Sequence, residues 1–304
     1  MAYCLEPGEN PAAGLRRIAR EQIGQAIKSA ARPAKDRDEA IHDIRKCMKK
    51  VRAVLRMARG ELGEKTYKSE NACFRDAAKS LAELREAAVL AGTVEKLESQ
   101  FAEQLAPGTF DSLLQHLRGK KDAVSERDLS QKNALDEVAR VLREARKRVK
   151  DWPLKSKDFS LMAPGIRRVY KRGRQGLKDV QKSPTDESFH EWRKQVKYLW
   201  YHARILEGSW PPVMAALVSE LDTLGDLLGE DHDLADLRRR VAQEPRLAGE
   251  PSEYEALLGL ITRRQDELRN RALALGKRLY AETPKAFVAR LAVYWSAAQA
   301  SSSD

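Results

Sequence analysis

Two stretches of the sequence combine histidine, arginine and lysine at the spacing of one helix face. The first stretch runs from His42 to Arg56, and its positive side chains recur every three or four residues. Its basic residues are His42, Arg45, Lys46, Lys49, Lys50, Arg52 and Arg56. Apolar residues recur on the opposite side, at Ile41, Ile44, Met48, Val51 and Leu55. Such a helix is apolar behind and densely positive in front, so its front repels itself unless an anion lies against it.

The same order of residue types returns 148 positions later, between His190 and Leu199. The basic and polar residues of this second stretch are His190, Arg193, Lys194, Lys197, Tyr198 and, one turn further on, Arg204. The apolar back consists of Phe189, Trp192, Val196, Leu199 and Ala203. A single basic helix face is usually an ordinary solvated surface. Two such faces in one chain, each opened by a histidine, indicate a shared function.

The chemistry that suits these faces is the binding of a polyanion, such as one that carries a row of phosphates. Cations at i, i+3, i+4 and i+7 stand in one row, where arginine can hold two phosphate oxygens and lysine acts as a mobile point charge. His42 could donate an N–H to phosphate or gain a proton beside it, and the alternative is that both histidines are structural residues at helix starts. Asp43 and Glu191 lie off the basic rows, and we interpret them as ties to neighbouring helices.

The composition agrees with an anionic partner. The chain has 304 residues, with 56 Lys and Arg against 45 Asp and Glu and a net charge of +11. This excess favours nucleic acid, an anionic membrane or a phosphate polymer. Three cysteines without metal-type spacing, no signal peptide and no apolar run long enough to span a membrane predict a cytoplasmic protein. We expect no cofactor and no metal, because Asp231-His232-Asp233 has no matching cluster and is interpreted as a capping and packing segment.

The apolar pattern predicts an all-α protein. Hydrophobic content is 42% with only 6% aromatic residues, and apolar residues recur at steps of three and four without a convincing period of two. The expected helices are 11–31, 36–60, 66–90, a short one from 93, 109–117, 130–150, one restarting near 166, 184–208, one from 211, one from 231, 252–280 and one from 283. Gly92 is expected to end the third helix, and Asp231 to begin a new one.

The chain also reads as an internal duplication. Leu15-Arg16-Arg17-Ile18 is echoed by Ile166-Arg167-Arg168-Val169 at nearly the same offset as the two basic stretches. This predicts halves at 12–150 and 164–298, a leader at 1–11 and a frayed tail at 299–304. Two tandem helical units usually pack about a pseudo-twofold axis, and such an axis would join the two basic faces into one surface.

At these residues the chain resembles the CHAD (conserved histidine α-helical domain) family. The matching text begins with His42-x-x-Arg45-Lys46-x-x-Lys49-Lys50-x-Arg52 and continues with His190-x-x-Arg193-Lys194-x-x-Lys197-Tyr198. Further matches are Leu228-Gly229-Glu230-Asp231-His232-Asp233-Leu234, Tyr170-Lys171-Arg172-Gly173-Arg174 and the Phe287 to Trp295 ending. The likeness covers roughly 12–298. Two departures are Arg85-Glu86, where Arg-Asp is often found, and Trp200 at the position equivalent to Arg52.

The resemblance implies two four-helix-bundle-like halves and a basic surface that binds inorganic polyphosphate without catalysis. It also implies association with polyphosphate granules. The expected site is His42, Arg45, Lys46, Lys49, Lys50, Arg52, Arg56, Arg167, Lys171, Arg174, His190, Arg193, Lys194, Lys197, Tyr198 and Arg204. The basic stretch 140–150 is interpreted as a solvated face.

Other function classes stay open. A nucleic-acid-binding protein fits the charge, but no helix-turn-helix, zinc-finger or RNA-binding signature is present. An enzyme of polyphosphate hydrolysis or transfer would need metal-holding carboxylates or a nucleotide loop, and the sequence shows neither. An accessory subunit of a polyphosphate-metabolising enzyme is a further alternative.

Overall fold

The computed structural model describes residues 3–33, 36–81, 86–106, 108–119, 124–248 and 250–301. Within these ranges, side chains are left undescribed at 86–88, 119, 124–131 and 248. Helices are the only regular elements in the described parts of the chain, which confirms the all-α prediction. In the same ranges no helix is both long enough and apolar enough to cross a bilayer.

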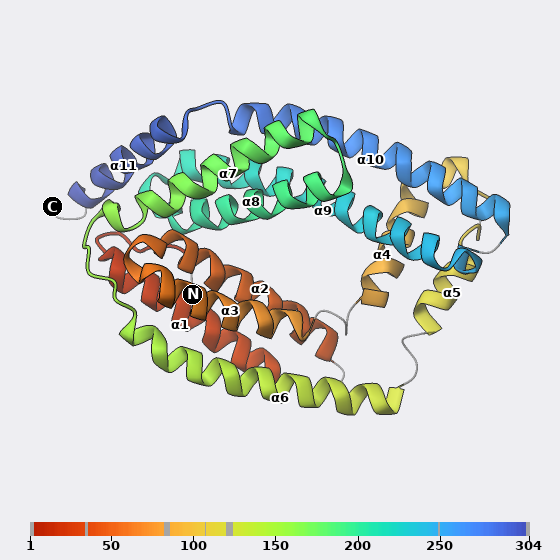
Figure 1. Ribbon diagram of the computed structural model, residues 1–304, viewed down its shortest axis with the longest axis horizontal. Helices are drawn as coiled ribbons and strands as arrows, with labels where there is room; N and C mark the ends of the chain where they lie inside the picture. The colour runs from red at the N-terminus through yellow and green to blue at the C-terminus, as the bar shows by residue number, and fades with distance from the viewer. Residues whose placement is uncertain are drawn as a thin grey trace.

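The first half of the chain forms six α-helices (Figure 1). They are α1 (Pro11–Ala30), α2 (Arg37–Met57), α3 (Arg59–Lys79), α4 (Glu86–Gln100), α5 (Asp111–Gly119) and α6 (Val124–Arg148). α1 begins where Asn10 accepts hydrogen bonds from the backbone N–H groups of Ala12 and Ala13. α2 packs against α1 and α3, and α6 packs against α1 and α3, so these four helices bury one apolar core.

The described residues of the second half form five α-helices. They are α7 (Ala163–Lys182), α8 (Asp186–Ile205), α9 (Pro211–Gln243), α10 (Pro251–Leu279) and α11 (Pro284–Ala300). α7 to α10 pack in sequence order, and α11 lies on α7. Thr185 and Ser188 cap α8 reciprocally, so Pro184 precedes the cap and does not open the helix as expected.

Several predicted boundaries are wrong for identifiable reasons. The expected helix 66–90 is two helices, because α3 ends at Lys79 and α4 begins at Glu86. Gly92 lies inside α4, since one glycine costs a helix only about 1 kcal/mol. α9 runs through Asp231-His232-Asp233, because Asp231 is buried there and accepts hydrogen bonds from Gln265 and Arg269. Arg85, one of the residues that depart from the family pattern, lies outside the described residues.

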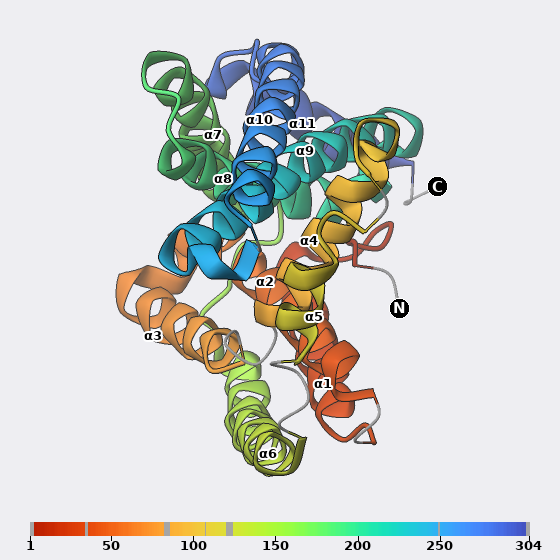
Figure 2. The same cartoon turned by 90° about the vertical axis from the view of Figure 1, so that its right-hand side faces the viewer.

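The two halves touch along α2. This helix packs against both α7 and α8, while α4 and α5 leave the first bundle to contact α9 and the short helix Pro245–Ala248 (Figures 1 and 2). Gly165 lies so near α2 that a Cβ there would stand 2.2 Å from the carbonyl oxygen of Met57. The crossing of α2 with α7 and α8 is the framework that positions the basic residues.

Candidate functional site

The two histidine-led helices cross with their basic residues toward one another. The guanidinium carbon of Arg56 lies 3.7 Å from the ring centroid of Tyr198, which joins α2 to α8. The counterparts of Arg56 and Tyr198 in the other helix, 148 positions away, are Arg204 and Lys50. These two residues also lie close together. Burial lowers the pKa of Lys50, and the charge of Arg204 lowers it further. Reciprocal pairs of this kind are what a pseudo-twofold crossing of α2 and α8 predicts. The pseudo-twofold symmetry of the two complete halves stays a prediction.

Lys49 stands at the middle of this crossing. Desolvation of its ammonium and then the nearby charges of Arg193, Arg45 and Lys197 together lower its pKa to about 8. Asp233 opposes this effect only weakly. The Lys49 ammonium makes no hydrogen bond or ion pair with any described residue, although its side chain still reaches solvent. We call Arg45, Lys49, Arg193 and Lys197 the basic cluster.

Helix α9 lies beneath the α8 members of the basic cluster. Lys197 Nζ lies 3.3 Å from Asp222 Oδ1 and 3.2 Å from Asp226 Oδ1, so two carboxylates already hold this ammonium. Gly225 leaves room for it, because a Cβ there would stand 2.7 Å from Lys197 Cε. Arg193 passes Gly229, and its buried Nε has no hydrogen-bond partner among the described residues. Asp222 and Asp226 of α9 therefore pair with Lys197 and do not pair with Lys49.

A row of arginines continues from the cluster along α2. Asn71 on α3 accepts hydrogen bonds from Arg52 Nε at 3.1 Å and from Arg56 Nη1 at 3.3 Å, which fixes both guanidinium groups. Burial lowers the pKa of Arg56, and the charges of Arg52 and Arg172 add to this. Arg172 therefore belongs to the same positive region, although the sequence did not indicate it. It lies seven residues after Gly165, so it returns to the side of α7 that faces α2.

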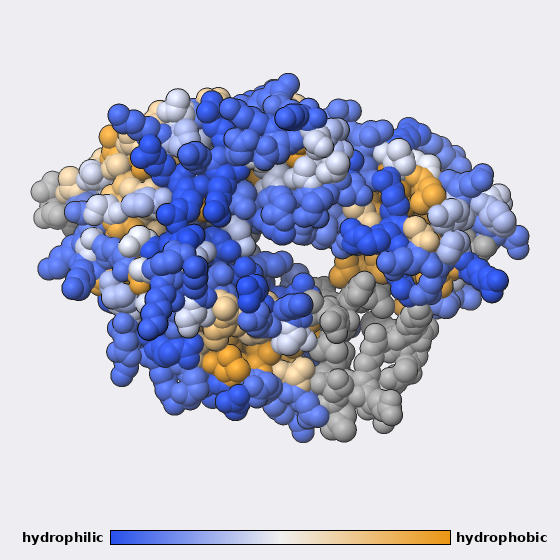
Figure 3. All heavy atoms as spheres, in the orientation of Figure 1, coloured by the Kyte–Doolittle hydropathy of each residue, from blue (hydrophilic) through white to orange (hydrophobic). Residues whose placement is uncertain are grey.

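The α7 residues expected from the sequence lie elsewhere. Arg167 and Lys171 are exposed, and no hydrogen bond or ion pair among the described residues joins either of them to the basic cluster. Arg174 Nε donates a hydrogen bond to the carbonyl oxygen of Tyr280 at 3.2 Å, so it ties α7 to the end of α10. Hydrophilic residues cover this part of the molecule in Figure 3.

The outer residues of the two basic stretches serve partly as local ties. Asp43 pairs with Arg32 at 2.8 Å, which confirms a tie to the segment after α1. Glu191 instead pairs with Lys194 in its own helix, so the expected tie to a neighbouring helix is wrong. Lys46 is exposed beside Lys50, at the edge of the site.

The histidines occupy different environments. His190 Nδ1 and His232 Nδ1 lie 3.1 Å apart, and His232 Nε2 lies 3.4 Å from Asp236 Oδ2. Burial lowers the pKa of both rings, to about 4 for His232, so both are neutral at pH 7 and one nitrogen donates to the other. His42 is exposed near the start of α2. No group of three His, Cys, Asp or Glu side chains suited to a metal occurs among the described residues.

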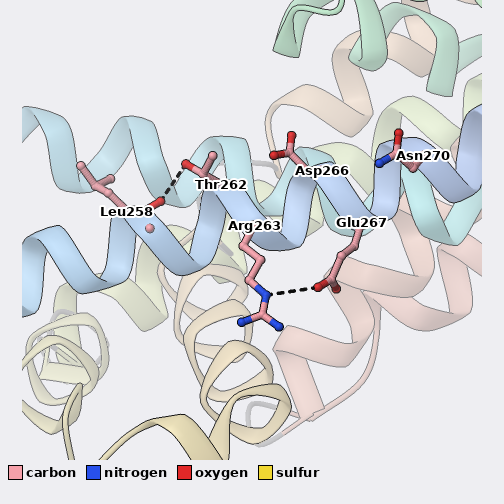
Figure 4. A pocket seen from close by; sticks show the side chains of 7 residues that line it. Leu258, Thr262, Arg263, Asp266, Glu267 and Asn270 are labelled. Atoms are coloured by element: carbon pink, nitrogen blue, oxygen red, sulfur yellow. Dashed lines mark hydrogen bonds and ion pairs between the residues drawn. The ribbon is translucent and has the colours of Figure 1, made fainter.

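Two surface hollows in the described part of the chain are lined by residues outside the basic cluster. The larger one lies along α10, where Thr262 donates to the carbonyl of Leu258 and Arg263 pairs with Glu267 (Figure 4). A smaller one between α4 and α9 is lined by residues that include Lys96, Glu230 and Asp233. The basic cluster is thus an open surface, which suits an extended ligand better than a small enclosed one.

Comparison with known proteins supplies the family. The CHAD domain family model matches residues 17–242, whereas a search of curated proteins finds no match. Among solved structures, the CHAD domain of the plant Ricinus communis is similar with a TM-score of 0.63 at 14% identity, covering 92% of this chain and 95% of that one. PptA from Streptomyces chartreusis is similar with a TM-score of 0.57 at 15% identity, covering 91% and 100%. The family model spans most of the chain, and the chain therefore belongs to the CHAD domain family.

Proposed function

We propose that this protein binds inorganic polyphosphate, without catalysis, on the surface where α2 crosses α8. The observation that carries the proposal is the meeting of Lys49, Arg193 and Lys197 from two counterpart helices, where Lys197 is paired with Asp222 and Lys49 forms no ion pair within the described part of the chain. Positive charges held this close repel one another, and a polyanion relieves that repulsion. The CHAD family is linked to polyphosphate, which supports the same ligand class.

The shape of the site fits a flexible phosphate chain. The row Lys49, Arg52 and Arg56 follows one side of α2, and Arg172 extends it across to α7. Successive phosphates can follow such a row without a fixed register, since lysine ammonium groups are mobile and arginine can hold two oxygens. Much of the affinity should come from released counterions and should fall steeply with salt.

The aromatic residues of the site favour polyphosphate over nucleic acid. The guanidinium group of Arg56 lies over the ring of Tyr198. Lys197 Nζ and the guanidinium carbon of Arg204 lie 4.9 and 5.0 Å from the ring centroid of Trp200. Rings used in this way do not offer themselves as platforms for base stacking, on which single-stranded nucleic-acid binders rely. We therefore propose a cytoplasmic role at polyphosphate granules, either alone or beside a polyphosphate-metabolising enzyme.

Charge reversal tests the location of the site. The variant R45E/K49E/R193E/K197E should lose binding to immobilised polyphosphate while its helical circular-dichroism spectrum stays unchanged. The matched control is K132E/K157E/R271E/K285E, which makes the same change in net charge at exposed positions away from the cluster. Equal loss in both variants would mean that net charge alone drives binding, and full retention in the first would place the site elsewhere.

Competition and product analysis test the ligand and the lack of chemistry. Long-chain polyphosphate should displace bound DNA or RNA at fixed ionic strength, and the nucleic acids should fail to displace polyphosphate. Incubation with polyphosphate and divalent cations should release no phosphate over hours. Phosphate release would instead identify an enzyme.

A further inference from the structure

We propose that the segment before α1 completes the polyphosphate surface, with Tyr3 as a positioning residue for two of its cations, Lys50 on α2 and Arg204 on α8. This inference rests on the function proposed above. It gives the site a second arm, which leads from the basic cluster to Arg204 and Lys50 and is distinct from the row of arginines along α2.

The ring of Tyr3 holds one cation from each half of the chain. Lys50 Nζ lies 5.1 Å from the ring centroid, and the guanidinium carbon of Arg204 lies 5.6 Å from it. Both distances are within the range over which an aromatic face attracts a cation. The Tyr3 hydroxyl donates a hydrogen bond to the carbonyl oxygen of Lys50 at 2.9 Å. The ring is therefore fixed on α2 and brings Lys50 and Arg204 together.

The segment that carries Tyr3 is also fixed on α8. The backbone N–H of Leu5 donates to the carbonyl oxygen of Ile205 at 2.9 Å, and the Leu5 side chain is buried. The rings of Tyr3 and Tyr201 meet edge to face, with their centroids 5.8 Å apart. Tyr3 itself is only 5% exposed, so its ring is part of the packed interior that supports the surface cations.

Trp200 joins this pair of cations to the basic cluster. Its ring centroid lies 4.9 Å from Lys197 Nζ and 5.0 Å from the guanidinium carbon of Arg204. Arg204 follows Lys197 by seven residues, which is two turns along the same side of α8. The cations thus follow one another from Lys197 across Trp200 to Arg204, and then across Tyr3 to Lys50. A phosphate chain bound at the cluster can continue along this second arm.

An aromatic support suits a phosphate-binding cation better than an acidic one. A carboxylate competes with phosphate for the cation that it holds, as Asp222 does at Lys197. A ring face attracts a cation without adding negative charge, and it leaves N–H groups free to donate to phosphate oxygens. Within the described part of the chain, no ion pair joins Lys50 or Arg204 to an acid. Both cations are thus positioned without a competitor for the ligand.

Substitution of Tyr3 in the full chain tests the proposal, with binding to long-chain polyphosphate measured over a range of salt concentrations. Tyr3→Leu removes the common support of Lys50 and Arg204. Binding at low salt should weaken about tenfold. The slope of log affinity against log salt should become shallower by about one unit for each cation that leaves the site. Tyr3→Phe keeps the ring face and should retain both the affinity and the slope.

Two further variants separate positioning from stability. Phe110→Leu removes an equally buried ring from α5, which packs against α4 and the short helix Pro245–Ala248, so it should destabilise the fold without changing the salt slope. In the K50Q/R204Q background, Tyr3→Leu should cause no further loss of binding, because the charges that it positions are already absent.

Three results would overturn this inference and leave the proposed function standing, provided that the unaltered protein binds polyphosphate. They are an unchanged salt slope in Tyr3→Leu, an equal loss of binding in Tyr3→Phe, and a further loss when Tyr3→Leu is added to K50Q/R204Q. If the unaltered protein does not bind polyphosphate, the proposed function fails, and the role of Tyr3 fails with it.

Discussion

Neighbouring cations on one helix can have very different surroundings, as Arg172 and Lys171 on α7 show. Both are exposed, and Arg172 is among the main charges that lower the Arg56 pKa, which places Arg172 near the arginine row of α2. We predict that Arg172→Glu weakens polyphosphate binding and reduces its salt dependence by about one unit of slope. Lys171→Glu makes the same change in charge one residue away and should leave both nearly unchanged. Equal effects in a salt titration of the two variants would contradict this placement.

His202 links the two halves through a hydrogen bond that depends on its protonation state. His202 on α8 is 1% exposed, and its Nε2–H donates to the carbonyl oxygen of Ala53 on α2 at 3.0 Å. Burial lowers its pKa from 6.5 to about 4. The unfolded chain therefore binds a proton at a higher pH than the folded chain does. The stability that neutral His202 provides is complete above pH 6.5 and is lost as the pH falls toward 4.

We predict that His202 accounts for up to about 3 kcal/mol of acid-induced loss of unfolding free energy between these limits. His202→Gln keeps an amide donor for Ala53 but cannot gain a proton, so its stability should vary less with pH over this window. His116→Gln, at an exposed position of α5, is the control and should keep the profile of the unaltered protein. Urea unfolding at a series of pH values measures the difference, and parallel profiles for all three proteins would refute the assignment.

Sequence spacing was enough to predict that Arg45, Lys49, Arg193 and Lys197 share basic helix faces, because helical periodicity alone fixes which residues share a face. It could not choose among the cations of α7. That choice depends on which side of α7 faces α2, and a close approach of two backbones at Gly165 decides it. The sequence also could not predict that Lys197 pairs with Asp222 and Asp226, since these residues belong to a helix whose direction only the tertiary structure sets.

At the scale of elements, Gly165 holds α7 against α2. A methyl group at this position would stand 2.2 Å from the carbonyl oxygen of Met57 and 2.6 Å from its Cα, and a backbone cannot yield as a side chain can. Gly165→Ala should therefore push the two helices apart and lower the free energy of unfolding by about 3 kcal/mol. It should also weaken polyphosphate binding, because Arg172 moves away from Arg56.

The control for this variant is Gly259→Ala on α10, where nothing lies within 4 Å of the added Cβ. This change should stabilise the protein by up to about 1 kcal/mol through helix propensity and leave binding unaltered. Chemical unfolding and a binding assay on both variants provide the measurement. If Gly165→Ala and Gly259→Ala both stabilised the protein, α7 and α2 would have space for an added methyl group between them.

Helix existence was largely predictable and helix length was not. Apolar spacing and the start signals at Pro11 and Thr283-Pro284 predicted α1 and α11 closely. α9 passes through a segment read as a helix start, because Asp231 is buried there and pairs with Arg269 of α10. Local signals cannot show that a polar segment has a tertiary partner, so such a segment looks like a boundary in the sequence.

At the scale of the whole molecule, the halves are joined by more than the basic crossing. Arg16 of α1 donates to the carbonyl oxygens of Trp152 and Leu154 at 2.6 and 2.9 Å, and Glu61 of α3 accepts from the N–H groups of Lys155 and Ser156. α4 packs against α9 of the other half. The segment between the halves is therefore fixed on the first bundle, and we expect the chain to unfold as one cooperative unit.

This unity has a measurable consequence for ligand binding. Polyphosphate that spans Lys49 on α2 and Arg193 on α8 binds only when both halves are folded, so it should stabilise the entire chain. We predict a single thermal transition whose midpoint rises with polyphosphate, corresponding to about 2.7 kcal/mol when the free ligand reaches a hundred times its dissociation constant. High salt should suppress the rise, and R45E/K49E/R193E/K197E should show none, whereas K132E/K157E/R271E/K285E should behave like the unaltered protein. Two transitions, of which polyphosphate moves only one, would show instead that a single half carries the site.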